Sequence, residues 1–198
     1  MIMEQCQLER LILVGNMGFT KAATALSQLL HKQITLRLPE VKMIEFAAVT
    51  EVIGEAGEPQ VVVFLRVDGE IPGKMALFFP LASAEFMAQT LVATDDDLNL
   101  FENQLAQSAL MEVGNILVSS FVWALADKTG FAISPSTPAI AIDMAGAALD
   151  AILVEDGVLD DNVLLLSTVI EGSSSLQGQF LFFPSAGSLE KLLEALAL

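Results

Sequence analysis

Residues 108–138, SALMEVGNILVSSFVWALADKTGFAISPSTP, decide the fold, because residues 9–39, ERLILVGNMGFTKAATALSQLLHKQITLRLP, repeat their pattern. Each copy holds an asparagine followed by 22 residues and a proline, and the copies are offset by 99 positions (108 − 9). The string LFFP also occurs twice, at residues 77–80 and 181–184. The chain therefore reads as an internal duplication with halves of about one hundred residues each.

Both halves have the same order of predicted elements. Residues 4–31 and 98–128 have apolar positions at helical spacing, and each run is followed by short β-rich segments and a closing helix. In the first half we expect separate strands at 34–38 and 41–46, divided by Pro39. The pattern predicts one α+β domain over residues 1–198, a pseudo-twofold duplication (1–97 and 98–198) with two long helices packed on a mainly antiparallel sheet.

The composition limits the classes of function. Hydrophobic residues make up 54% of the 198 positions, and the net charge is −16. Such a surface repels phosphate backbones, so we expect no nucleic-acid binding. One histidine and one cysteine are too few for a His-based triad, a multi-histidine zinc site or an internal disulfide. The longest uncharged stretches are too short to span a membrane or are interrupted by proline. The N-terminal segment MIMEQCQLER has no basic region of the kind that begins a secretory signal. We therefore expect no membrane span and a cytoplasmic protein.

The second long helix carries the candidate site. At 100° per residue, Ser108, Glu112, Asn115 and Ser119 share one stripe, and an apolar stripe lies opposite them. Because the apolar stripe must face the core, the polar stripe should face solvent or a partner. A carboxylate and an amide three positions apart can reach the same point outside the protein. The opposite, apolar stripe comprises Ala106, Leu110, Val113, Leu117, Phe121 and Ala124.

The Ser-x3-Glu-x2-Asn-x22-Pro spacing resembles that of the CheC/CheX family of chemotaxis phosphatases. The string EVGNI at 112–116, its counterpart VGNMG at 14–18, and the segment from 22–26 to 38–41 extend the resemblance over essentially the whole chain. The length is closer to CheC than to the shorter CheX. The resemblance implies removal of the phosphoryl group from the phosphorylated aspartate of a CheY-type response regulator.

The resemblance also implies roles for individual residues. Glu112 would engage a lysine of the regulator, and Asn115 would orient the water that attacks phosphorus in line. Phosphoryl transfer depends mainly on positioning and charge neutralisation, for which these two side chains are suited. The Mg²⁺ that offsets the phosphoryl charge would belong to the regulator, so we expect no cofactor bound by this chain itself. Ser108, one turn before Glu112, would support the site through a hydrogen bond to Glu112 or a contact with the partner, although a plain solvent-facing serine fits equally well.

The first half departs from the family pattern. It keeps Asn16, but Leu13 stands where the glutamate belongs and Glu9 stands where the serine belongs. We expect this degenerate site to contribute little, so that substituting Glu112 or Asn115 abolishes turnover and substituting Asn16 barely changes it.

Two other functions fit the same residues. The chain could be a non-catalytic module that binds the regulator and is related to the middle domain of flagellar switch proteins. It could also be a scaffold for the deamidase CheD with weak phosphatase activity. The sequence leaves open the choice between monomer and homodimer. Two further expectations concern single features: Trp123 is assigned to the core, and Asp95–Asp97 to a solvated helix cap or linker.

Overall fold

The computed structural model describes residues 4–31, 33–54, 58–92, 98–153, 161–171 and 176–197. Each half opens with a 26-residue helix, as the duplication predicts. The helices are α1 (Gln5–Leu30), α2 (Val49–Ile53), α3 (Leu81–Val92), α4 (Gln104–Thr129), α5 (Ala145–Leu153) and α6 (Ser188–Ala197), with a short 3₁₀ turn at Phe46–Ala48. The strands are β1 (Thr35–Glu45), β2 (Pro59–Gly69), β3 (Gly73–Pro80), β4 (Ile133–Pro135), β5 (Ala139–Met144), β6 (Asn162–Glu171) and β7 (Leu176–Pro184).

Among the described residues, seven strands form one antiparallel sheet in the order β1-β6-β7-β3-β2-β4, with β5 also paired to β2. Exchanging each strand with its counterpart in the other half reverses this order, so the sheet has the symmetry of the duplication. The symmetry axis passes between β3 and β7, where the two LFFP strings lie on neighbouring strands and Leu77 pairs with Phe180. The predicted α+β class and antiparallel sheet are confirmed.

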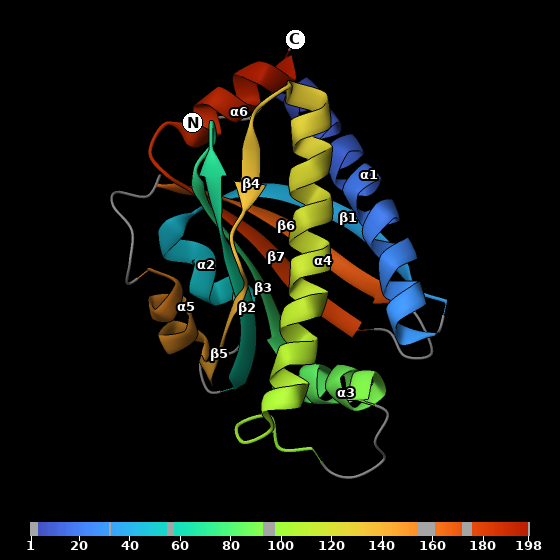
Figure 1. Ribbon diagram of the computed structural model, residues 1–198. Coiled ribbons are helices and arrows are strands. Elements are labelled where there is room, and N and C mark those ends of the chain that lie inside the picture. The colour runs from blue at the N-terminus through green and yellow to red at the C-terminus, as the bar shows by residue number, and fades with distance from the viewer. Residues whose placement is uncertain are drawn as a thin grey trace.

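Helices cover both faces of this sheet because successive strand residues point to opposite sides. On β2, Val61, Val63 and Leu65 belong to the larger buried cluster beneath α1 and α4, whereas Val62 belongs to a second cluster beneath α2 and α5. Figure 1 shows α1 and α4 side by side on one side of the sheet and α2 and α5 together on the other. The site helix α4 is therefore supported by α1 on its flank and by the sheet below.

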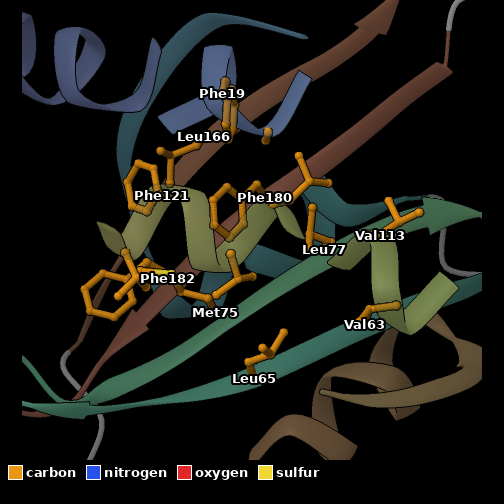
Figure 2. Close-up of a cluster of buried hydrophobic side chains, with 14 of the residues drawn as sticks. Phe19, Val63, Leu65, Met75, Leu77, Val113, Phe121, Leu166, Phe180 and Phe182 are labelled. Atoms are coloured by element: carbon orange, nitrogen blue, oxygen red, sulfur yellow. The ribbon is translucent and has the colours of Figure 1, made fainter. Parts of the chain in front are cut away.

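Three phenylalanines join the two long helices to the central strands. The ring centroids of Phe19 on α1 and Phe121 on α4 lie 6.4 Å apart, and both rings contact Phe180 on β7, at 6.0 and 5.3 Å. Figure 2 shows these rings among the other buried side chains of the cluster. Aromatic pairs at this spacing contribute roughly 0.5–1.5 kcal/mol beyond their burial, so this contact fixes α4 against both neighbours.

The predicted start of the second long helix at residue 98 is wrong: α4 begins at Gln104. Asn99 and Asn103 explain the difference, since their side chains accept hydrogen bonds from the backbone N–H groups of Phe101 and Ala106, each at 3.0 Å. Such local bonds favour a turn and a helix cap over helix continuation. The helix ends at Thr129, one residue beyond the predicted end at 128, because Gly130 adopts φ 73° and its N–H donates to the carbonyl of Ala126.

The two strands predicted at 34–38 and 41–46 form one strand, β1, whose pairing with β6 shifts register between Arg37 and Glu40. Pro39 lies within this irregularity, because proline has no N–H to donate to the ladder. In the second half, Pro138 lies between β4 and β5. Helix α5 follows β5 directly, and Asp95–Asp97 lie outside the described residues.

Of the described helices, α4 alone is long and apolar enough to cross a membrane. Within its apolar 18-residue window, 56% is buried inside the protein. A buried core helix satisfies the same length and composition criteria, so this feature is weak evidence for a membrane span.

An ion pair ties the β2–β3 turn to α6 and predicts a pH effect. Lys191 Nζ lies 2.9 Å from Glu70 Oε2, and the Ala132 N–H donates to Glu70 Oε1 at 3.0 Å. The Lys191 hydrogen bond, aided by the Ala132 N–H, lowers the pKa of Glu70. The stabilisation is therefore present above the unfolded-state pKa and is lost as pH falls through the folded-state pKa.

We expect Glu70→Gln to make stability less dependent on pH in this acidic range and to change it little at higher ionic strength, because the pair is exposed. Urea unfolding midpoints between about pH 3 and 6 measure the effect. Glu58→Gln, at an exposed glutamate just before β2, is the control. Equal pH dependence in the two variants would contradict the assigned role of the ion pair.

Candidate functional site

Helix α4 presents its polar stripe outward because its opposite face packs on the sheet. The predicted apolar stripe is buried throughout, which confirms that part of the pattern. Gly114 lies directly over β2: a Cβ added there would overlap Val63 Cγ1 and lie 3.0 Å from Val63 Cβ. Gly114, which lies between Glu112 and Asn115 in the sequence, thus allows α4 to pack closely on the sheet, while the two polar side chains lie on the outer side of the helix.

The structure places Glu112 and Asn115 on the outer side of α4. Glu112 is exposed, and no other described residue forms a hydrogen bond or ion pair with its carboxylate. Asn115 is half-buried, and its Oδ1 accepts a hydrogen bond from Ser119 Oγ at 3.2 Å. This bond orients the Asn115 amide while the second lone pair of Oδ1 and the two N–H donors stay available for water or a partner.

Ser108 is exposed one turn before Glu112. Its hydroxyl donates to the Gln104 carbonyl at 2.8 Å rather than to Glu112. Ser108 therefore does not orient the Glu112 carboxylate in this structure. Of the two supporting roles expected for Ser108, the contact with a partner protein stays a prediction.

The corresponding face of α1 lacks a carboxylate at the position equivalent to Glu112, which is occupied by Leu13. Leu13 is 58% exposed, and Asn16 is also exposed. Leu13, which occupies the position equivalent to Glu112, therefore lies on the surface and does not pack into the core. Thr20, which corresponds to Ser119, donates to the Asn16 backbone carbonyl at 2.8 Å, so it does not orient the Asn16 amide.

The assignment of Trp123 to the core is wrong. Its side chain is 45% exposed, and Lys21 Nζ lies 3.8 Å from the ring centroid. Trp123 follows Glu112 by 11 positions, which returns it to nearly the same direction on a helix. That spacing was visible in the sequence, but the tryptophan's high hydrophobicity favoured the core.

The same fold occurs in solved structures of other proteins. FliY from Thermotoga maritima matches with a TM-score of 0.76 at 19% identity, covering 100% of this chain and 98% of that chain. The FliM middle domain from H. pylori matches with a TM-score of 0.64 at 13% identity, covering 97% and 99%. At these identities the comparison shows the fold alone: this is the α+β class to which FliY and the FliM middle domain belong.

The sequence comparisons define the family. A model of the CheC-like family matches residues 105–142, the segment that contains Glu112, Asn115 and Pro138. The protein named CheY-P phosphatase CheC from Bacillus subtilis (strain 168) is 34% identical over 195 residues, covering 96% of this chain and 93% of that protein. The chain therefore belongs to the CheC/CheX family, as its motif spacing predicted.

Proposed function

We propose that this protein hydrolyses the aspartyl phosphate of a CheY-type response regulator in the cytoplasm. The observation that carries the proposal is the outward-facing pair Glu112 and Asn115 on α4, at the family's spacing and in a chain related to CheC over nearly its full length. An acyl phosphate on another protein can be reached only by side chains that project from the surface, and these two do.

The two side chains have different tasks in this proposal. Glu112 pairs with a lysine of the regulator and holds the two proteins in register, because a charge-assisted hydrogen bond is short and directional. Asn115 accepts from and donates to a water molecule and holds it in line with the phosphorus–oxygen bond that breaks. Ser119 keeps the Asn115 amide in one orientation. Little covalent chemistry is required, since positioning and electrostatics account for most of the catalysis of phosphoryl transfer.

The cation in this reaction is assigned to the regulator. A Mg²⁺ ion held by carboxylates of the receiver domain would neutralise the phosphoryl oxygens. In this proposal, Glu112 and Asn115 act on the regulator's lysine and on the water without binding the ion.

The second candidate function is a non-catalytic module that binds the regulator or CheD, and the shared fold with the FliM middle domain favours it. Phosphate release from phosphorylated receiver domains distinguishes the two functions. We expect the wild-type protein to accelerate release from at least one receiver of its organism. Binding without acceleration across all of these receivers would support the module and contradict the phosphatase.

The first-half site provides a gain-of-function prediction. Because Leu13 is exposed, a glutamate should be accepted there without loss of packing. We expect Leu13→Glu in an Asn115→Ala background to restore activity through Asn16, by about tenfold over Asn115→Ala alone. Initial rates of phosphate release measure this gain.

The matched control is Leu13→Gln in the same background, which provides a similar shape without the charge. Equal rates for the glutamate and glutamine variants would show that the missing carboxylate at position 13 is not the cause of low activity at the first-half site.

A further inference from the structure

The exposed face of α4 extends beyond Glu112 and Asn115 in both directions along the helix. Leu105, Glu112 and Trp123 differ by 7 and 11 positions, so they lie almost on one line along the helix. Leu105 is 68% exposed and Trp123 is 45% exposed, and they lie on either side of the polar pair. Most other large apolar side chains of α4 are buried against the sheet and α1.

Trp123 holds a cation at its end of this line. Lys21 reaches across from α1, and its Nζ stacks 3.8 Å from the Trp123 ring centroid. Within the described part of the chain, no carboxylate forms an ion pair with Lys21. A stacked ammonium is held in place by the ring yet keeps its donors available. Because the chain has a net charge of −16, it has no general attraction for an acidic partner, and Lys21 provides a local positive charge.

We propose that Trp123 and Lys21 form an anchor for the phosphorylated receiver domain, outside the catalytic pair. The inference rests on the proposed function. The partner is identified by charge: a receiver that holds Mg²⁺ beside an acyl phosphate must surround its pocket with carboxylates, which a lysine complements. The aromatic ring supplies the apolar contact area that dominates small interfaces.

The dimensions agree with this assignment. Glu112 and Trp123 are 11 positions apart on the helix, a rise of about 16 Å. A standard interface buries roughly 800 Å² on each partner, which is a disc about 30 Å across. A receiver centred over the Glu112–Asn115 pair therefore covers Trp123, and the anchor and the catalytic pair contact the same bound molecule.

Steady-state kinetics on the full-length protein separate the anchor from the catalytic pair. We expect Trp123→Ala to raise KM for the phosphorylated receiver about tenfold with kcat nearly unchanged. Lys21→Glu should raise KM similarly and reverse the effect of added salt, because it exchanges attraction for repulsion. The control is Met144→Ala, at an apolar residue of β5 that is 46% exposed; it should change neither constant.

Binding to a beryllofluoride-activated receiver provides a second readout that requires no turnover. The Kd should rise about tenfold for Trp123→Ala and Lys21→Glu, and circular dichroism should show that both variants stay folded. Unchanged KM and Kd in both variants would overturn the anchor even if Asn115→Ala abolished turnover. If the wild type dephosphorylated none of its organism's receivers but these variants bound a receiver more weakly than the wild type does, the phosphatase would be contradicted and the anchor retained.

Discussion

Replacing Asn115 with alanine is expected to reduce kcat for regulator dephosphorylation by about 10²-fold or more, with little change in KM. Losses of this size follow when a group that positions a reactant is removed. The amide acts on the water only when the complex has formed, so its removal should leave association intact. Its side chain is half-buried on α4 and bonded only to Ser119 among the described residues, so the helix should remain folded.

Single-turnover measurements of phosphate release from a saturating complex test this directly, because they isolate the chemical step from binding. Asn16→Ala is the matched control: the same residue type, at the equivalent position of the first half, on an equally long helix. It should retain nearly the full rate. If Asn16→Ala were the damaging change and Asn115→Ala were silent, the assignment of function to the second half would be wrong.

Glu112→Gln should behave differently from Asn115→Ala. It keeps the shape of the side chain but removes the charge that pairs with the regulator's lysine. A hydrogen bond to a charged group contributes about 1.5–3 kcal/mol, which corresponds to a loss of roughly 10- to 100-fold in kcat/KM. Because the pair also fixes the geometry of the complex, part of this loss should appear in kcat.

The duplication made the architecture predictable. The repeated asparagine–proline spacing and the two LFFP strings indicated equivalent halves, and the sheet places those strings on adjacent strands at its centre. The helix face of Glu112 and Asn115 could be predicted because only one side of α4 is continuously apolar. Their catalytic roles depend on a second protein and stay predictions.

Two features that the sequence did not predict, the start of α4 and the environment of Trp123, depend on contacts of individual side chains. The start of α4 is set by Asn99 and Asn103, whose side chains bond the backbone and replace the helical bonds that the apolar pattern suggested. The exposed position of Trp123 agrees with its 11-residue spacing from Glu112, but no pattern within α4 reveals that Lys21 of α1 lies over its ring. Both wrong predictions concern side chains whose contacts are determined by three-dimensional geometry rather than by hydrophobicity.

The close packing of α4 relies on small residues at two contacts. A Cβ on Gly18 of α1 would lie 2.9 Å from both Phe121 Cα and the Ser120 carbonyl oxygen, so the backbones of α1 and α4 approach each other closely at this glycine. Gly114 makes the corresponding contact between α4 and β2. The site residues therefore sit on a helix whose height above the sheet is fixed by a glycine placed between them.

Gly114→Ala is expected to destabilise the protein, although alanine favours a helix by about 1 kcal/mol over glycine. The added methyl would overlap Val63, which is fully buried and β-branched, so the neighbour cannot rotate away easily. Overpacking of this kind costs about 1–3 kcal/mol, which exceeds the helix gain. Lifting α4 should also displace Glu112 and Asn115 and lower kcat.

Urea unfolding and phosphate release measured on the same variants test this account. Gly146→Ala is the control, because it makes the same substitution in helix α5 where a Cβ meets no atom within 4 Å; it should be neutral or stabilising. Val63→Ala should remove the overlap. The double variant with Gly114→Ala should therefore lose less unfolding free energy than the sum of the losses in the two single variants. Additive losses, or equal stability of the Gly114 and Gly146 variants, would mean that the helix height is set elsewhere.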